Sequence, residues 1–337
     1  MNRVAFLALT GLVAQNTALV ILLKYSFREN AQQYAPSTLV LTSELMKLII
    51  CGMAVGMRSS ETLTLVVRDS LSNSLLFVPS ILYVVQNNLL LFGAKRLSSL
   101  TFIVCTQTKI LTTAAISRIM LRTKFSSRQI VALGCLTLGV VLVQHEEDNG
   151  KFRLAQASGS SGSEDHLLGI SAVLLASLTS GAAGVTLEKV FKESSYGRCT
   201  HHSVWTRNVQ LSLISLPFAA LGVILQGYER VSRNRFFYGY DLIVWSIVLL
   251  QAAGGIIIAF VMKFASNMLK CIAIALSICV CALFSVVTQG TEVSFFLCFG
   301  VCTVNASIAI YSSSKPNSMS QESADTEHGK VITEIRS

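Results

Sequence analysis

Charged residues are scarce in this chain, and that scarcity excludes a water-soluble globular protein. Asp, Glu, Lys and Arg make up 13% of the 337 residues, whereas a soluble domain carries about 25% because polar side chains must cover its surface. Hydrophobic residues reach 52%, and the mean hydropathy is +0.59. An outer surface this apolar needs lipid around it, so the composition predicts an integral membrane protein.

The motifs of common nucleotide-dependent enzymes and hydrolases are missing as well. The chain contains no D-x-D pair, no P-loop and no G-x-S-x-G sequence. Its five histidines fall in predicted loops, a linker or the tail, and no carboxylate closely follows His201-His202. We therefore expect no catalytic residue, no metal site and no cofactor, and we interpret the chain as a protein that is not an enzyme.

A disulfide framework is also lacking, although the chain has nine cysteines. Eight of them fall inside apolar segments, and only Cys199 lies in a predicted loop. We interpret the eight as small apolar packing residues of helices.

What the chain contains instead is a series of apolar segments, each long enough for a bilayer that takes about 20 helical residues to cross. The first includes Gln15 and Asn16 and has no small-residue cleavage site after it, so we interpret it as a helix and not as a signal peptide. The sequence thus predicts an all-α membrane protein with ten transmembrane helices. They are Val4–Leu23, Thr38–Met57, Leu75–Ala94, Leu100–Met120, Gln129–Gln144, Leu167–Leu187, Val204–Gln226, Leu242–Met262, Met268–Val287 and Val293–Tyr311.

These segments divide the chain into two halves of five helices each. The first half covers residues 1–144 and the second half residues 167–311. Residues 145–166 between them are acidic and rich in Ser and Gly, which is the composition of a flexible linker. Residues 312–337 are polar and rich in Ser and Glu, so we expect a disordered tail.

The net charge of +9 arises from basic residues in many short loops and not from one dense patch, which argues against nucleic acid as a partner. With the N-terminus placed in the cytosol, 15 Lys and Arg outside the segments fall on the cytosolic side and 9 on the other side. This bias predicts that both termini and the loop around Lys124 are cytosolic, and that the linker near Asp148 is lumenal.

A weak internal repeat relates the two halves. Both Lys109 and Lys270 lie in the fourth helix of a five-helix half. An odd number of helices per half gives the halves opposite orientations, so the pattern predicts two inverted five-helix repeats with a solute site at their interface. A shift of 161 residues aligns Gly93 with Gly254, Lys109 with Lys270, Ala114 with Ala275 and Gly139 with Gly300.

Cations inside the apolar segments are the first candidates for that site. An ammonium group within the bilayer costs roughly 2.5–3.5 kcal/mol, so it usually faces a cavity or a partner. Lys109 lies about ten residues from either end of its segment, and we interpret it as a phosphate-binding cation with Lys270 as its counterpart. The alternative is a structural pair, or snorkelling from a helix end, which suits Lys270 better than Lys109.

Other polar residues in the segments leave a structural and a functional interpretation open. Glu44 and Lys47 are three residues apart and share a helix face, so they form either a structural ion pair or a substrate contact or gate. Two further groups either pack against neighbouring helices or reach the solute: the amides of Gln86, Asn87 and Asn88, and the neighbours Arg207 and Asn208.

A set of short stretches runs from the second to the ninth segment: Val78–Ser80, Tyr83–Asn88, Gln107–Ala114, Ser180-Gly181 with Gly184, Leu187–Val190, Val204–Gln210, Phe236–Tyr240, Gly254-Gly255 and Val261–Lys270. Each is weak alone. Together they resemble the nucleotide-sugar transporters of the drug/metabolite transporter superfamily, in the branch that carries CMP-sialic acid, UDP-galactose and UDP-N-acetylglucosamine.

The resemblance implies an antiporter that brings a nucleotide sugar into the Golgi lumen in exchange for a nucleoside monophosphate, by alternating access and without ATP. In the family, lysines at the positions of Lys109 and Lys270 contact the phosphate. The resemblance also marks cavity-lining positions at Tyr83, Asn87, Asn88, Thr113 and Asn208, and a charged pair facing the cavity at Glu44 and Lys47.

The substrate itself is less closely indicated. The run Lys109–Thr113 is more similar to the UDP-sugar branch, so UDP-galactose or UDP-N-acetylglucosamine is the expected substrate. The family has a tyrosine in the region of Cys105 and Thr106 and another at the position of Ser212, and this chain lacks both. How the base and the sugar are recognised is therefore left open. The rival hypothesis is a metabolite or phosphate-ester exporter of the same plan that does not use nucleotides. A homodimer, and residence in the endoplasmic reticulum, are left open.

Overall fold

The computed structural model describes residues 3–26, 34–58, 76–94, 96–97, 99–123, 125–149, 163–193, 204–224, 236–289 and 295–313. Every regular element of substantial length within these ranges is an α-helix, which confirms the predicted all-α class. The helices are α1 (Arg3–Ser26), α2 (Pro36–Arg58), α4 (Phe77–Ala94), α5 (Ser99–Met120), α6 (Ser127–Asn149), α7 (Ser163–Glu193), α8 (Val204–Gly222), α10 (Leu242–Phe264), α11 (Asn267–Gln289) and α12 (Phe295–Ser313).

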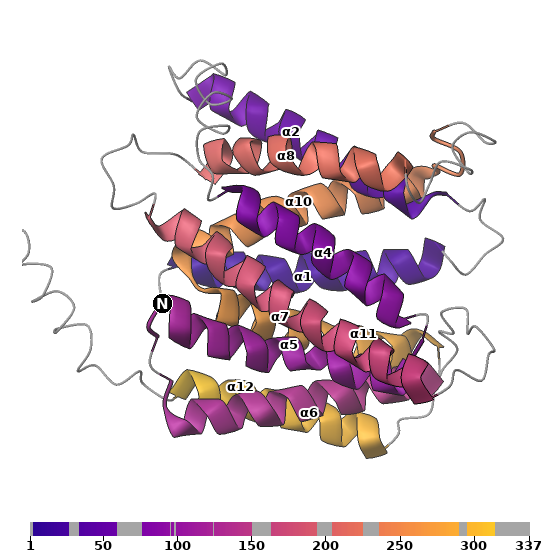
Figure 1. Cartoon of the computed structure of the whole chain (residues 1–337), viewed down its shortest axis with the longest axis vertical. Coiled ribbons are helices and arrows are strands. Elements are labelled where there is room, and N and C mark those ends of the chain that lie inside the picture. The colour runs from indigo at the N-terminus through magenta and orange to yellow at the C-terminus, as the bar shows by residue number, and fades with distance from the viewer. Residues whose placement is uncertain are drawn as a thin grey trace, which may run out of the picture.

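Each of these helices overlaps one of the predicted segments. α6 continues past Gln144 to Asn149, and α7 begins before Leu167, at Ser163. The centre of the predicted linker, residues 150–162, and the predicted tail beyond residue 313 lie outside the described residues. Figure 1 shows the helices stacked along the long axis of the molecule, with α2 and α8 at one end and α6 and α12 at the other.

Six of the described helices are long and apolar enough to cross a membrane: α1, α2, α7, α10, α11 and α12. The described helices α4, α5, α6 and α8 are not among these six. Of these, α8 has a lowered hydropathy because Arg207, Asn208 and Gln210 lie close together near its start. Most of the predicted cavity and phosphate-binding residues lie on three of these four helices, α4, α5 and α8.

The most extensive helix contacts follow an exchange rule between the two halves. α1 packs extensively on α10 and α11, and its counterpart α7 packs extensively on α4 and α5. α4 and α10 are the third helices of their halves, and α5 and α11 are the fourth. Swapping the halves therefore turns the α1–α10 contact into the α7–α4 contact, and the α1–α11 contact into the α7–α5 contact. α2 packs on α8, the two second helices, and α6 packs on α12, the two fifth helices, so swapping the halves leaves both pairs unchanged. The two pairs lie at opposite ends of the stack (Figure 1).

The α6–α12 contact shows the same exchange at the level of single residues. A Cβ atom on Gly139 would lie 2.9 Å from a methyl group of Val304 and 3.1 Å from the carbonyl oxygen of Gly300. A Cβ atom on Gly300 would lie 2.9 Å from a methyl group of Val143 and 3.0 Å from the carbonyl oxygen of Gly139. The shift of 161 residues that aligns the glycines also aligns Val143 with Val304. Because Gly139 meets Val304 while Val143 meets Gly300, the two helices run antiparallel.

Polar side chains of α1 are satisfied by neighbouring helices, which explains why an otherwise apolar segment tolerates them. Gln15 Nε2 donates to the carbonyl oxygen of Leu250 on α10 at 2.9 Å, in space left by Gly254. Asn16 Nδ2 donates to Ser277 Oγ on α11 at 2.6 Å. α1 is thus bound to the second half by hydrogen bonds as well as by apolar packing.

The Phe236–Tyr240 stretch forms the turn that leads into α10. Gly239 takes a φ of 79°, a left-handed conformation that favours glycine. Tyr240 Oη donates to Thr38 Oγ1 at 3.1 Å, near the start of α2. Asp241 then caps α10, because its Oδ1 accepts from the backbone N–H of Val244 at 2.8 Å. This stretch therefore fixes where α10 begins relative to α2.

Candidate functional site

The two lysines aligned by the repeat lie on helices that contact one another. Lys109 is in the middle of α5, and Lys270 is in the first turn of α11. Lys109 is close enough to Lys270 and Cys271 for electrostatic interaction with both. Both lysine residues are half-buried. The predicted pair thus comes together in the fold, one lysine from each half.

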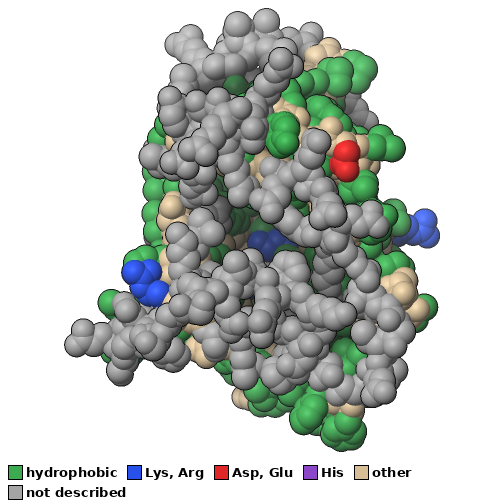
Figure 2. All heavy atoms as spheres, turned by 90° about the vertical axis from the view of Figure 1, so that its right-hand side faces the viewer, with side chains coloured by type: hydrophobic (Ala, Val, Ile, Leu, Met, Phe, Trp, Pro, Cys, Tyr) green, Lys and Arg blue, Asp and Glu red, His purple; other side chains and the backbone are tan. Residues whose placement is uncertain are grey.

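Within the described residues, neither ammonium group forms an ion pair or a hydrogen bond. The ion pairs seen there are Glu44–Lys47 and Glu188–Lys192. Two like charges near one another in a helical interior raise the local positive potential, and lowered dielectric strengthens their attraction for an anion. Figure 2, which looks onto the side of the molecule that is on the right in Figure 1, shows Lys or Arg side-chain atoms set back near the middle of that side. A phosphate-bearing solute is the chemistry that suits such a site.

Thr113 lies one turn after Lys109 on α5, at a close contact with α7. It is buried, and a Cβ atom on Gly181 of α7 would lie 3.2 Å from both its Cα and its backbone nitrogen. The neighbouring Thr112 donates from Oγ1 to the carbonyl oxygen of Ser177 at 3.0 Å. Gly181 therefore lets α7 approach α5 closely, and this contact together with the Thr112 hydrogen bond holds the helix that carries Lys109.

The predicted residues of α4 differ in exposure. Tyr83 is half-buried, whereas Asn88 is exposed and donates from Nδ2 to the carbonyl oxygen of Val84 in its own helix at 2.9 Å. The side chain of Asn87 lies outside the described part of the chain. The cavity-lining roles of Tyr83, Asn87 and Asn88 stay predictions.

The predicted residues of α8 are buried inside the bundle. Asn208 donates from Nδ2 to the carbonyl oxygen of Val204 at 2.9 Å. Arg207 donates from Nη1 to Oε1 of the equally buried Gln210 at 2.9 Å. Asn208 remains a candidate cavity residue, with its amide donor already engaged in its own helix.

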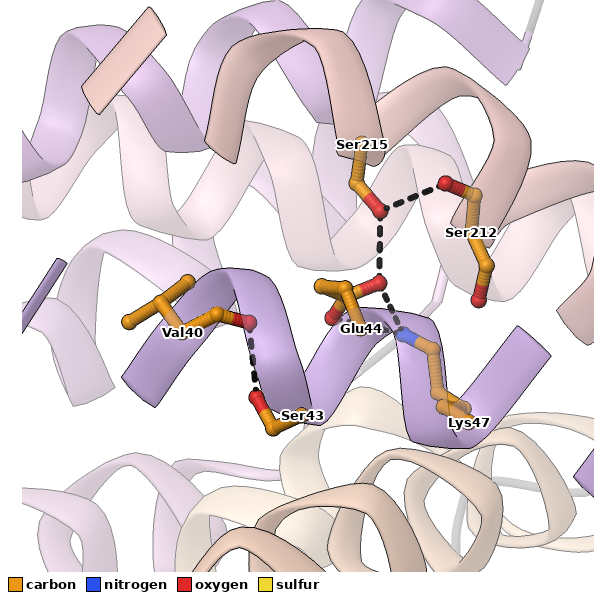
Figure 3. Close-up of polar contacts among 6 residues, drawn as sticks. All are labelled: Val40, Ser43, Glu44, Lys47, Ser212 and Ser215. Carbon is orange, nitrogen blue, oxygen red and sulfur yellow. Dashed lines mark hydrogen bonds and ion pairs between the residues drawn. The ribbon is translucent and has the colours of Figure 1, made fainter. Parts of the chain in front are cut away.

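Glu44 and Lys47 form the predicted ion pair on α2. Lys47 Nζ lies 2.8 Å from Glu44 Oε1 and 2.7 Å from Oε2, and the side chains are only 11% and 22% exposed for Lys47 and Glu44. Ser215 on α8 donates to Glu44 Oε2 at 2.6 Å, as Figure 3 shows. A Cβ atom on Gly255 of α10 would lie 2.9 Å from Cδ of Lys47. The pair therefore sits where α2, α8 and α10 meet.

Two polar residues were not predicted from the sequence to take part. Ser215 completes the contacts of Glu44, but a serine in an apolar helix gives no signal of its own. Glu188, which is 2% exposed, is a buried carboxylate near the end of an apolar segment. A buried carboxylate is rare enough to mark Glu188 as a candidate from the sequence. The sequence does not show that its partner is the backbone N–H of Asn267 on α11, 79 residues later in the chain.

Comparison with known proteins decides the family. The nucleotide-sugar transporter family model matches residues 1–312. The chain belongs to the nucleotide-sugar transporter family. It is 39% identical over 290 residues to a UDP-N-acetylglucosamine/UDP-N-acetylgalactosamine transporter of Caenorhabditis elegans, covering 82% of this chain and 84% of that protein.

Other relatives extend this family assignment. A human UDP-N-acetylglucosamine transporter is 39% identical over 83% of this chain and 86% of its own length. A UDP-galactose transporter of Schizosaccharomyces pombe is 36% identical over 95% of this chain and 90% of its own length. A solved crystal structure with 13% sequence identity superposes with a TM-score of 0.61, covering 92% of this chain and 96% of that one, and supports the fold. This family member is thus a multi-pass membrane protein.

Proposed function

We propose that this transporter carries a UDP-sugar, UDP-N-acetylglucosamine or UDP-galactose, into the Golgi lumen in exchange for UMP. The observation that carries the proposal is the meeting of Lys109 and Lys270, one from each half, without an acidic partner among the described residues. Membership of the family and the substrates named for the relatives support the nucleotide and the sugar.

The proposed mechanism is alternating access by two inverted five-helix repeats. A two-fold axis that passes between α2 and α8 and between α6 and α12 would relate the two halves. Such an axis would produce the exchange of helix contacts and the reciprocal contacts of Gly139 and Gly300, which support this proposal. A diphosphate bound between Lys109 and Lys270 would bridge the halves, so that binding couples to their relative motion. Uptake then needs no ATP, because the outgoing nucleotide supplies the gradient.

Transport by purified protein tests this function. Liposomes that contain the transporter are preloaded with UMP, CMP, GMP or buffer, and uptake of labelled UDP-N-acetylglucosamine, UDP-galactose and CMP-sialic acid is measured. We expect UDP-sugar uptake that rises severalfold with internal UMP and remains low with GMP. Equal uptake with and without internal nucleotide would contradict antiport, and competition by a phosphate ester but by no nucleotide would favour the rival exporter.

The proposed orientation places both termini in the cytosol and the segment between α6 and α7 in the lumen. Its support is the 15 to 9 bias of Lys and Arg across the predicted loops. An epitope inserted after Gly159 should be inaccessible to antibody when only the plasma membrane is permeabilised, and an epitope at the C-terminus should stain. The opposite staining pattern would reverse the topology.

A further inference from the structure

The two lysines that the repeat aligns do not occupy equivalent places in their helices. Lys109 lies ten residues after the start of α5 at Ser99, whereas Lys270 lies only three residues after the start of α11 at Asn267. The orientation of Lys109 is therefore set by a continuous helix on both sides. The orientation of Lys270 depends on how the first turn of α11 is held.

Two separate groups hold that first turn. Ser266, just before α11, accepts the backbone N–H of Leu269 on its Oγ at 3.3 Å. Glu188, from α7, accepts the backbone N–H of Asn267 on its Oε2 at 2.8 Å. The first N–H groups of a helix have no partner within the helix, so these two contacts satisfy donors that would otherwise be buried and unpaired. The N–H of Lys270 is the next donor, and it bonds the carbonyl oxygen of Ser266 at 3.1 Å.

Glu188 is buried and makes a contact with each of its carboxylate oxygens. It is 2% exposed, and its other oxygen, Oε1, pairs with Lys192 one turn later on α7 at 2.5 Å. One turn earlier, Gly184 leaves the space that the Asn267 side chain fills, because a Cβ atom there would lie 2.4 Å from Asn267 Nδ2. α7 thus offers α11 both a fitted surface and an anion at the positive end of its helix dipole.

We infer that Glu188 is a positioning residue for the anion site, acting through the first turn of α11 on the ammonium group of Lys270. This inference rests on the proposed function of Lys270 in nucleotide binding. A carboxylate at the helix start favours the closely packed arrangement of α7 and α11 and offsets the repulsion between the helix N-terminus and the lysine in its first turn. Removal of the carboxylate lets the first turn fray, which displaces Lys270 and weakens nucleotide binding.

The test is the kinetics of UMP exchange in proteoliposomes, with the rate expressed per reconstituted transporter. Glu188→Ala is expected to raise KM for UMP about tenfold, the effect of losing one charge-assisted cap, while Vmax stays within about twofold. Glu188→Gln keeps an oxygen acceptor for the Asn267 N–H and should recover most of the change. Glu188→Asp retains the charge but is one methylene too short to reach, so it should behave like Glu188→Ala.

The matched control is Lys192→Gln, which removes the exposed partner of Glu188 and leaves the contact with Asn267 in place. Its KM should equal that of the wild type. A merely structural role of Glu188 would lower Vmax, because fewer transporters are active, with KM unchanged. A KM within twofold of the wild type in both Glu188→Ala and Glu188→Asp would overturn the inference. Absence of UMP exchange by the wild type would instead overturn the proposed function.

Discussion

Replacing Lys109 or Lys270 by Gln is expected to reduce UMP-driven exchange of the UDP-sugar about a hundredfold, with the protein still folded. Gln keeps much of the side-chain length and removes the charge. Loss of one partner of a close, poorly solvated charge pair costs about 2–5 kcal/mol, and about 2.7 kcal/mol corresponds to two orders of magnitude in affinity. Neither lysine has an acidic partner among the described residues, so the substitution leaves no buried carboxylate unpaired.

The measurement is exchange by purified variants in liposomes, with thermal unfolding in detergent as the check on folding. Lys263→Gln is the matched control, because Lys263 is a half-buried lysine in the last turn of α10, close in the chain to Lys270. It should transport normally. Lys109→Arg should also fail, because a planar guanidinium is larger and differently hydrated than an ammonium group. Near-normal exchange by both Gln variants would remove the phosphate-binding role and leave the lysines as structural residues.

The second large effect is expected at the ion pair of α2. Glu44→Ala removes the only acidic partner that the structure describes for the largely buried Lys47, and breaking a buried pair in this way costs about 3–5 kcal/mol. It also leaves the hydroxyl of Ser215 without its acceptor on α2. We therefore expect a large fall in the unfolding temperature in detergent, together with poor expression.

The double variant Glu44→Leu with Lys47→Met separates structure from transport. Replacing both charges with apolar side chains of similar volume leaves no unpaired charge, so much of the lost stability should return. If the pair serves structure alone, this variant should exchange UMP at close to the wild-type rate. If the pair gates the cavity or contacts substrate, the variant should be stable and inactive. We expect the second result, because the pair lies where helices of both halves meet.

Much of the fold could be predicted from hydropathy because lipid imposes a simple rule. A helix must satisfy its backbone hydrogen bonds internally and must be long enough to cross. Hydropathy also made Lys109 conspicuous, because a cation in an apolar segment is costly within the bilayer and usually faces a cavity or a partner. The repeat then led to Lys270, which hydropathy alone would have left as a cation near a helix end. These two predictions rest on one-dimensional patterns, and the two lysines lie on helices in contact, near enough for their charges to interact.

The rest could not be predicted because it depends on which helices meet. Nothing in the sequence near Glu188 shows that its carboxylate reaches the backbone of Asn267. Asn88 donates to the carbonyl oxygen of Val84 in its own helix, a contact that the sequence did not indicate, and its cavity role stays a prediction. The predicted segments did place Lys109 within a helix and Lys270 near a helix start, but they gave no sign of which groups hold that first turn. Side-chain direction and helix breaks are three-dimensional facts that a periodic pattern does not carry.

The contact between Gly139 and Gly300 restricts how this chain can change through mutation. Most packed positions tolerate an enlargement when a neighbour becomes smaller, and pairs of such changes leave a trace as correlated substitutions. Here each glycine faces the backbone of the other helix, and both are already the smallest residue. Enlargement of either has no compensating change within the pair, because a carbonyl oxygen cannot be trimmed. The two positions should therefore stay fixed without covarying, so this close approach of α6 and α12 is one that methods based on correlated substitutions would fail to detect.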